Sequence, residues 1–260
     1  MTQSRFHVTD NVYVVGCGEW NGLRKLTVAG ANVHLLDGGS ELALIDVGQP
    51  ESVPGLLRNI ADAGFDVAKI KKVLITHSHT DHVDGLADVL KTLDCTVYGH
   101  ALAKETLSGK QGIYSDDYKG PGTPIAPVHE VVREGDAIRV GHVELRVIEL
   151  PGHTPDCLGF VFDLPNGHGP ACFTGDTAIG DQAHISGCIG WIDYNWNSKL
   201  TDFRASLKRV AGMKFNAIFP GHGFGIVGRE AVGTSMEHCV ARIEQFMAIP
   251  QLGSMFRIQI

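Results

Sequence analysis

The 260-residue sequence predicts an α/β fold in which two mixed β-sheets pack face to face between two layers of helices. Strand-like apolar runs occur in two clusters along the chain, and segments with helical periodicity lie between and after them. Residues with metal-binding side chains directly follow several of these runs. The apolar content of 43% is typical of a globular protein with an ordinary core. We therefore expect a four-layer αββα sandwich with a site at one edge, where strand ends meet.

The predicted strands are apolar or alternating runs bounded by glycine, proline or polar residues. They cover 11–15, 33–36, 42–45, 73–76, 96–98, 143–150, 158–162 and 217–219. A further short apolar run at 171–173 precedes the sequence Thr174-Gly175-Asp176. In the strand at 143–150, apolar and polar residues alternate, which indicates one buried face.

The predicted helices have apolar residues at spacings of three and four. They cover 53–63, 81–93, 200–211 and 229–247. The second of them carries one apolar stripe, formed by Val83, Leu86, Leu90 and Leu93. Thr80 is suited to be the N-cap of this helix. Gly85, early in the helix, would allow the chain to pass close to its neighbours.

We expect a single domain over 1–260, because no low-complexity linker divides the chain. The segment 108–127 is rich in glycine and proline, and no helical or strand period fits it. A connection of this length without regular structure is often functional, so we interpret it as a lid over the site. The alternatives are a plain surface excursion or an oligomer contact. The loop at 16–26, with Trp20, is a candidate for the rim of the pocket.

Composition excludes several classes of protein. The net charge of −7 disfavours a nucleic-acid partner, which requires a basic face. No run of apolar residues is long enough to cross a membrane, and 1–20 does not have the pattern of a signal peptide. The six cysteines are scattered without a C-x-x-C motif, which indicates reduced thiols. We expect a cytoplasmic protein that acts on a small molecule, with no nucleic-acid or membrane partner. Homo-oligomerisation is left open.

The most informative segment is His77-Ser78-His79-Thr80-Asp81-His82, which follows the predicted strand 73–76. Imidazole nitrogens and carboxylate oxygens are ligands that suit zinc, iron and manganese. Residues i and i+2 of an extended segment project to the same side, so His77 and His79 can converge on one ion. Asp81 and His82 fall in the first turn of the following helix and are expected to point away from the first pair. This hexapeptide could therefore supply two adjacent ions.

Three later segments share one pattern, a predicted strand followed by glycine or proline and then a single ligand-type residue. They are Pro151-Gly152-His153, Thr174-Gly175-Asp176 and Pro220-Gly221-His222. Loops at strand ends are where many scaffolds place catalytic groups. Together with the hexapeptide, these segments indicate one metal site assembled from distant parts of the chain.

The order of these motifs, from Asp46 to His222, resembles that of the metallo-β-lactamase superfamily and is most similar to its glyoxalase II-like and lactonase-like branches. The resemblance implies the metallo-β-lactamase fold and a role for Asp46 in orienting ligands. It implies a first metal held by His77, His79 and His153. It implies a second metal held by Asp81, His82 and His222, with Asp176 bridging both.

The sequence differs from two branches of the superfamily, and both differences narrow the class of substrate expected. β-Lactamases of the superfamily usually lack the last histidine of the hexapeptide and have cysteine at the position of Asp176, which argues against a β-lactam substrate. Glyoxalase II-like members usually have an arginine-containing loop after Thr-Gly-Asp. Here no arginine occurs at 180–191, and Trp191, Tyr194 and Trp196 are found instead. This difference counts against a glutathione thioester.

The resemblance implies a dinuclear metal-dependent hydrolase that cleaves an ester, thioester or lactone by attack of a metal-bridging hydroxide. Two divalent ions are expected, with zinc favoured and iron or manganese as alternatives. Asp81 is expected to orient the nucleophile in addition to binding metal. Two other functions remain as alternatives, namely a mononuclear iron oxidoreductase of the persulfide dioxygenase type and a low-turnover metal-binding regulatory protein.

Overall fold

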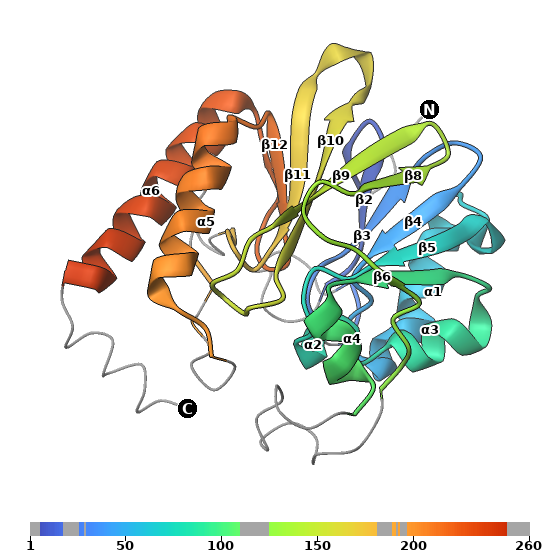
Figure 1. The fold of residues 1–260 in the computed structure, drawn as a ribbon. Helices are drawn as coiled ribbons and strands as arrows, with labels where there is room; N and C mark the ends of the chain where they lie inside the picture. Colours follow the sequence, from blue (N-terminus) through green and yellow to red (C-terminus); the bar gives the residue numbers. More distant parts are fainter. Residues whose placement is uncertain are drawn as a thin grey trace.

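The structure, a computed structural model, describes residues 6–17, 26–28, 30–109, 125–180, 189–190, 192 and 197–248. It confirms the predicted four-layer sandwich of two mixed sheets between helices (Figure 1). The first sheet has the strand order β1-β2-β3-β4-β5-β6-β7, and the second has the order β13-β12-β11-β10-β9-β8. Parallel pairing joins β4 to β5, β5 to β6, β6 to β7 and β11 to β12, whereas the other pairs are antiparallel.

The strands of the first sheet are β1 (His7–Thr9), β2 (Val12–Gly16), β3 (Val33–Asp37), β4 (Leu42–Ile45), β5 (Ile70–Leu74), β6 (Thr96–Gly99) and β7 (Glu130–Val131). Those of the second are β8 (Ala137–Val140), β9 (Val143–Glu149), β10 (Leu158–Leu164), β11 (Gly169–Gly175), β12 (Ala217–Pro220) and β13 (Ile226–Val227). The helices are α1 (Val53–Asp62), α2 (Thr80–Val83), α3 (Leu86–Thr92), α4 (Ala101–Leu107), α5 (Leu200–Met213) and α6 (Arg229–Ala248).

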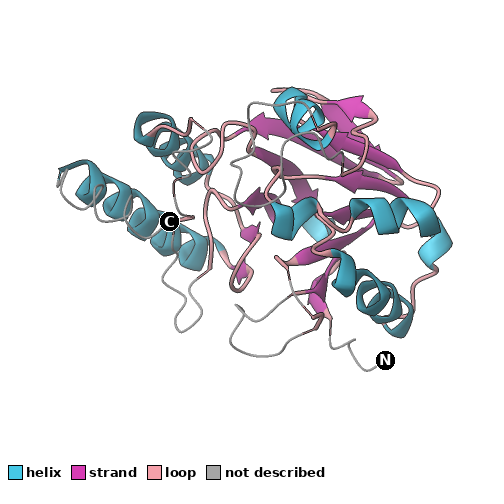
Figure 2. Ribbon diagram, turned by 90° about the horizontal axis from the view of Figure 1, so that it is seen from below, coloured by secondary structure: helices cyan, strands magenta, loops and turns pink. Residues whose placement is uncertain are grey.

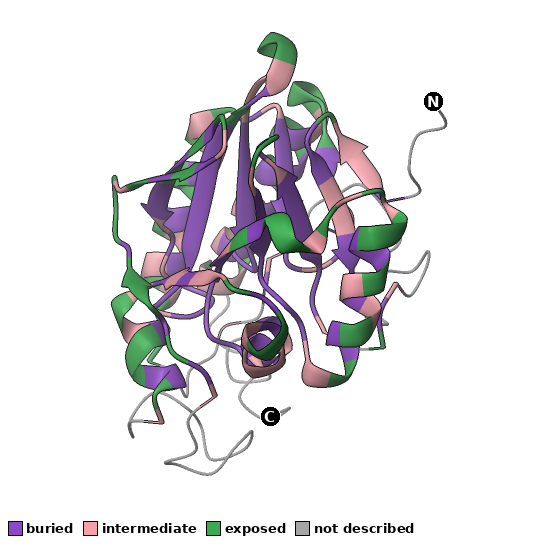
Figure 3. Ribbon diagram, turned by 90° about the vertical axis from the view of Figure 1, so that its right-hand side faces the viewer, coloured by how far each residue is buried: buried purple, intermediate pink, exposed green. Residues whose placement is uncertain are grey.

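Three apolar clusters fill the spaces between the four layers. One joins the first sheet to α1, α3 and α4, a second lies between the sheets, and the third joins the second sheet to α5 and α6. In Figure 2 the sheets lie between helices on both sides. In Figure 3 the colour for buried residues covers most of the strands, whereas the exposed residues lie mainly in helices and loops. The central strands are therefore buried on both faces.

The period-2 alternation of side chains explains how one strand serves two clusters. In β4, Leu42 and Leu44 belong to the cluster under the helices, whereas Ala43 and Ile45 belong to the cluster between the sheets. All four are at most 1% exposed. Burying one leucine or isoleucine side chain contributes about 1.5–3 kcal/mol before the opposing loss of chain entropy. A shift of β4 by one residue would move each side chain to the opposite cluster, so the burial of both sets fixes the register of the strand.

The predicted helix at 81–93 is wrong, because the chain forms two helices, α2 and α3, with a break at Asp84 and Gly85. The carbonyl of Asp81 accepts the Ala31 N–H, and the carbonyl of His82 accepts N–H groups from Val47 and Gly48. These carbonyls therefore cannot continue the α-helical ladder. The expected close approach at Gly85 is confirmed, since a Cβ there would lie 2.9 Å from Val53 Cγ2 and 3.1 Å from Gly48 O.

The ends of other helices and strands differ less from the predicted ones. Thr80 is the first residue of α2 and His79 its N-cap, so the predicted N-cap was one residue too late. The strand predicted at 73–76 is β5, which ends at Leu74, because the Thr76 N–H donates to the Asp46 side chain instead of to a neighbouring strand. The short elements β1, β7, β8, β13 and α4 were not predicted.

Several predictions concern residues outside the described ranges. These are 110–124 of the predicted lid, 18–25 of the predicted rim loop, and Trp191, Tyr194 and Trp196. Their roles therefore stay predictions. Within the described ranges, no helix combines the length and the apolar character needed to cross a membrane.

Candidate metal centre

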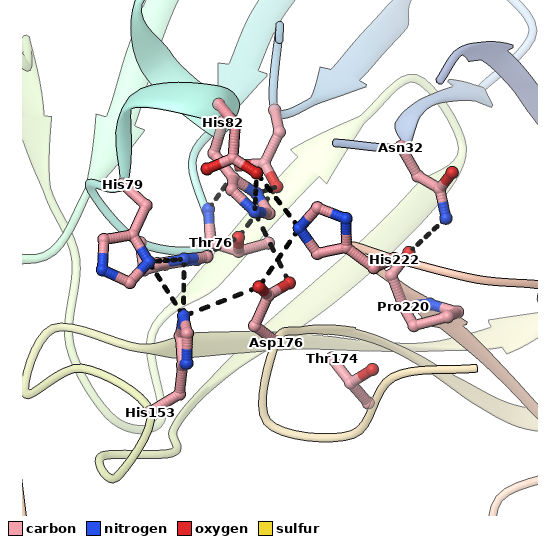
Figure 4. Close-up of polar contacts among 12 residues, drawn as sticks. Asn32, Thr76, His79, His82, His153, Thr174, Asp176, Pro220 and His222 are labelled. Carbon is pink, nitrogen blue, oxygen red and sulfur yellow. Dashed lines mark hydrogen bonds and ion pairs between the residues drawn. The ribbon is translucent and has the colours of Figure 1, made fainter. Parts of the chain in front are cut away.

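The predicted ligands all follow the C-terminal ends of strands. The hexapeptide follows β5, and the three later segments follow β9, β11 and β12. Because β4 and β5 are parallel, and β11 and β12 are parallel, the loops after each pair emerge at one edge of their sheet. The two sheets face each other, so these loops meet at one edge of the sandwich (Figure 4).

The first ligand group consists of His77, His79 and His153, which are at most 6% exposed. His77 Nε2 lies 3.0 Å from His79 Nδ1, and His153 Nε2 lies 3.2 Å and 2.9 Å from those two atoms. Nitrogen ligands about 2.0–2.1 Å from a tetrahedral zinc ion would lie about 3.3–3.4 Å apart. Three ring nitrogens that face one another at nearly this spacing are suited to share one cation.

The second ligand group consists of Asp81, His82 and His222. Asp81 Oδ2 lies 3.1 Å from His222 Nε2 and 3.8 Å from His82 Nε2. The expectation that His82 would point away from the first pair is wrong, because its ring centroid is only 4.1 Å from that of His77. The two ligand groups are therefore directly adjacent.

Asp176 lies between the two ligand groups, as Figure 4 shows. Its Oδ2 is 3.5 Å from His153 Nε2 and 3.3 Å from His222 Nε2, and its Oδ1 is 3.5 Å from His82 Nε2. The structure thus brings all seven predicted ligands together, and it places Asp176 within reach of both groups.

Two buried atoms of the site, His82 Nε2 and Asp176 Oδ1, have no hydrogen-bond partner among the described residues. An unsatisfied buried nitrogen or carboxylate oxygen is unfavourable by about 1–3 kcal/mol or more. Both atoms are of the types that bind zinc, and both face the space between the groups. The residues present therefore fit a divalent cation.

Asp46 orients one histidine of each group. Its Oδ2 accepts hydrogen bonds of 2.8 Å from His82 Nδ1–H and from the Thr76 hydroxyl, and its Oδ1 accepts the Thr76 N–H at 2.8 Å. Since the Thr76 hydroxyl donates to Asp46, it accepts from His77 Nδ1–H at 3.1 Å. In their neutral forms, both histidines would therefore present an Nε2 lone pair to the site. Asp46 has a φ of 59°, a left-handed conformation that aspartate tolerates better than most residues.

Two glycines leave room for the ligands. A Cβ at Gly221 would overlap Asp176 Oδ1 and lie 2.6 Å from His82 Cε1. A Cβ at Gly190 would overlap the Asp176 carbonyl oxygen and lie 2.9 Å from His153 Nδ1. The close packing at both positions is compatible only with hydrogen as the side chain.

The electrostatic environments of the two groups differ. Burial lowers the pKa of His82, but Asp176, Asp81 and Asp46 outweigh burial and raise it well above the usual range. For the same reason Asp176 and Asp81 raise the pKa of His222 to about 10. Burial, together with repulsion from neighbouring histidines, holds the pKa of His77 well below its usual range. The second group therefore attracts positive charge, and the first offers a neutral imidazole.

The pKa values of the carboxylates shift in the opposite direction, downward. Burial raises the pKa of Asp176, but His222 and His82 outweigh it and hold the pKa well below the usual range. Burial acts in the same way on Asp81, whose pKa His82 and His222 keep low. Both carboxylates are thus ionised at neutral pH, as metal ligands must be.

Sequence reasoning missed two buried polar residues beside the ligands. Asp156 accepts hydrogen bonds from Ser78 and Thr154, and Asn32 donates to the carbonyls of Pro220 and Gly223. Asp156 follows the Gly-His-Thr-Pro sequence directly, and this position was the one available signal. No local sequence pattern indicated that Asn32 lies at the site.

Comparison with known proteins gives the family. The family model of the metallo-β-lactamase superfamily matches residues 26–222. The chain is 28% identical over 229 residues to thioesterase pkgB of Emericella nidulans, covering 86% of this chain and 55% of that protein. It is 33% identical over 188 residues to a hydroxyacylglutathione hydrolase of Rhodopseudomonas palustris (strain BisB5), covering 71% of this chain and 62% of that protein.

Solved structures show the same fold. A subclass B3 metallo-β-lactamase of Bradyrhizobium japonicum has a TM-score of 0.74 at 23% identity, with 96% of this chain and 95% of that chain covered. A metallo-β-lactamase from Novosphingobium pentaromativorans has a TM-score of 0.71 at 20% identity, with 95% and 90% covered. Fold, motif order and family model agree, and the chain belongs to the metallo-β-lactamase superfamily, as its motifs predicted.

Proposed function

We propose that this protein is a dinuclear metal-dependent hydrolase that cleaves an ester, thioester or lactone. The observation that carries the proposal is the convergence of both ligand groups on Asp176. Every group of three or more metal-binding side chains found in the described part of the chain belongs to this site. The names of the relatives, thioesterase and hydroxyacylglutathione hydrolase, favour an acyl compound as the substrate.

The first ligand group would hold one ion and the second ligand group the other, with Asp176 contacting both. Zinc is the ion proposed, because the donors are nitrogen and carboxylate oxygen and hydrolysis needs no redox change. When bound, two such ions would acidify a water molecule and polarise the substrate carbonyl. The other steps of the reaction would depend on the protein's own side chains.

Exposure indicates from which side the substrate approaches. The side chains of Asp81 and His222 are 33% and 22% exposed, whereas those of His82, His153 and Asp176 are at most 8% exposed. A substrate would therefore reach the site on the side of Asp81 and His222. Asp81 is ionised there at neutral pH, so its carboxylate can accept a hydrogen bond from an attacking water and orient it. The buried Asp46 carboxylate instead holds His82 and Thr76 in place.

The proposal is tested by elemental analysis and a substrate panel. Protein purified without chelator should contain about two equivalents of a divalent metal and hydrolyse members of an ester, thioester and lactone panel. Chelation should remove the activity, and added Zn²⁺ should restore it. Protein that carries less than one equivalent of any transition metal and gains none on incubation would refute the proposal.

The two alternative functions make different predictions. A mononuclear iron oxidoreductase does not need a second ligand group, yet Asp81, His82 and His222 are assembled here. Oxygen uptake with a persulfide substrate would nevertheless decide in its favour. A regulatory protein would bind two metals and hydrolyse nothing in the panel.

A further inference from the structure

A buried carboxylate that is not a predicted ligand joins the two segments of the first ligand group. Asp156 lies in the loop between β9 and β10 and is 1% exposed. Its Oδ2 accepts the Ser78 N–H at 3.0 Å and the Ser78 hydroxyl, and its Oδ1 accepts the Thr154 hydroxyl at 2.6 Å. Ser78 stands between two histidines of the first group, and Thr154 directly follows the third. Asp156 therefore fixes the position of these histidines relative to one another.

The second ligand group is held by a different side chain, Asn32, which is 2% exposed and lies just before β3. Its Nδ2 donates to the carbonyl oxygen of Pro220 at 2.9 Å (Figure 4). It also donates to the carbonyl oxygen of Gly223 at 2.8 Å, so the two bonds lie on both sides of the intervening His222. The N–H of the preceding residue, Ala31, donates to the Asp81 carbonyl at 3.0 Å. This segment joins the hexapeptide to the turn after β12.

We propose that the two metal positions are preorganised separately, the first by Asp156 and the second by Asn32. The inference rests on the proposed metal centre and adds two positioning residues to it. Each side chain binds backbone or hydroxyl groups next to a ligand, so each acts through its neighbours. Residues that orient metal ligands change metal affinity by about 10- to 100-fold when they are replaced. Because the two sets of hydrogen bonds share no residue, their effects should be confined to one metal each.

The test measures Zn²⁺ affinity in two single-site backgrounds of the full chain. His222→Ala removes a ligand of the second group and leaves the first group complete, and His153→Ala does the reverse. Asp156→Ala and Asn32→Ala are each combined with both backgrounds. The metal-free proteins are then titrated with Zn²⁺ against a chelating indicator dye.

Asp156→Ala should weaken Zn²⁺ binding about 10- to 100-fold in the His222→Ala background and less than about threefold in the His153→Ala background. Asn32→Ala should show the opposite pattern. Equal losses in both backgrounds, or no loss in either, would overturn the inference. If the wild-type protein binds no Zn²⁺ at all, the proposed function fails instead, so the two failures are distinguishable.

Asn59→Ala is the matched control for a general loss of stability. Asn59 Nδ2 donates to the carbonyls of Val15 at 2.8 Å and Leu26 at 3.0 Å, the same kind of contact that Asn32 makes. This variant should lower the melting temperature of the metal-free protein and change neither Zn²⁺ affinity. Losses of affinity as large as those of Asp156→Ala would show that stability alone is responsible, and would overturn the inference.

Two further variants separate hydrogen bonding from charge. In Asp156→Asn the amide oxygen can accept both Ser78 donors, and the amide NH₂ can donate to Thr154 Oγ1, whose hydroxyl can turn to Cys157 Sγ, 3.1 Å away. This variant should keep first-site affinity within about tenfold of the wild type. If Asp156→Ala does not fold, Ser78→Ala removes one of the bonds and should weaken the first site alone by about three- to tenfold. Two results would contradict positioning by hydrogen bonds. One is an unchanged Zn²⁺ affinity of the first site in Ser78→Ala. The other is a loss of that affinity in Asp156→Asn as large as in Asp156→Ala.

Discussion

Two buried histidines of this protein occupy opposite electrostatic environments. His82 is fully buried at the metal edge, where its Nδ1 lies 2.8 Å from Asp46 and its Nε2 faces Asp176 and Asp81. His34 is 2% exposed in the core between the sheets, with its ring 5.4 Å and 5.9 Å from those of Phe173 and Phe219. Burial lowers the pKa of His34 to about 3, whereas the carboxylates raise that of His82 well above the usual range.

The comparison shows that burial by itself does not determine the charge of a histidine. Three carboxylates around His82 stabilise positive charge, and a divalent cation can replace the proton that they favour. The aromatic surroundings of His34 favour the neutral ring, and among the described residues no group of three or more metal-binding side chains includes it. The chemistry of the edge therefore depends on its carboxylates.

The largest effect is expected from Asp176→Asn. The substitution removes the charge that faces His82, His153 and His222 while keeping the shape of the side chain. Turnover of a hydrolysed substrate should fall by about 10³-fold or more, because a bridging charge at the reacting centre is lost. The metal content, determined by elemental analysis, should also fall. An unchanged rate would refute the bridging role of Asp176.

Asp46→Asn should have the next largest effect. The side-chain amide has one acceptor oxygen instead of two, so its NH₂ group would face either the Thr76 N–H or both the Thr76 hydroxyl and His82 Nδ1–H. Rotation of the amide toward His82 would favour the tautomer with Nε2–H, which cannot bind metal. Zn²⁺ affinity should fall by about 10- to 100-fold in a competition titration. Asparagine also tolerates the left-handed backbone at this position, so the substitution should not strain the main chain.

Gly221→Ala tests the packing of the carboxylate. The added methyl group would overlap Asp176 Oδ1 and lie 2.6 Å from His82 Cε1. Overpacking of this kind is typically destabilising by about 1–3 kcal/mol, and displacement of either ligand should also lower the metal content. The matched control is Gly212→Ala in α5, where nothing lies within 4 Å of the new Cβ. The control should be more stable than the wild type by about 0.5–1 kcal/mol in chemical denaturation. An equal change in the free energy of unfolding of the two variants would contradict the close packing at Gly221.

Most of the fold could be predicted because its central strands are buried in a regular pattern. The runs at β4, β9 and β10 have apolar residues at every position or at alternate positions, and the structure has strands there. The break between α2 and α3 could not be predicted, because it depends on carbonyls that bind Ala31, Val47 and Gly48 from other parts of the fold. The strand β7 has only two residues, which is too short for a periodic signal.

The residues of the site were predicted from local motifs, and the structure brings them together. What supports them could not be predicted in the same way. Ser78 and Asp156 are 78 residues apart, and Asn32 and Pro220 are 188 apart. Only the tertiary fold brings such partners into contact, and neither Asp156 nor Asn32 lies at one of the predicted ligand positions.

The smallest effect is expected from His34→Leu, which tests the apolar side of the comparison. The pKa of His34 is about 3 in the folded protein, against about 6.5 for an unperturbed histidine. As pH falls below about 6.5, the unfolded chain binds a proton that the folded protein does not, so this histidine lowers stability progressively in acid. Between pH 7 and pH 5.5 the wild type should lose about 1 kcal/mol more than His34→Leu, measured by chemical denaturation of the metal-free proteins. The other histidines titrate in both proteins, so their contributions cancel in the difference. Equal losses in the two proteins would mean that His34 gains a proton in the folded state, and the aromatic core would then be more polar than its neighbours indicate.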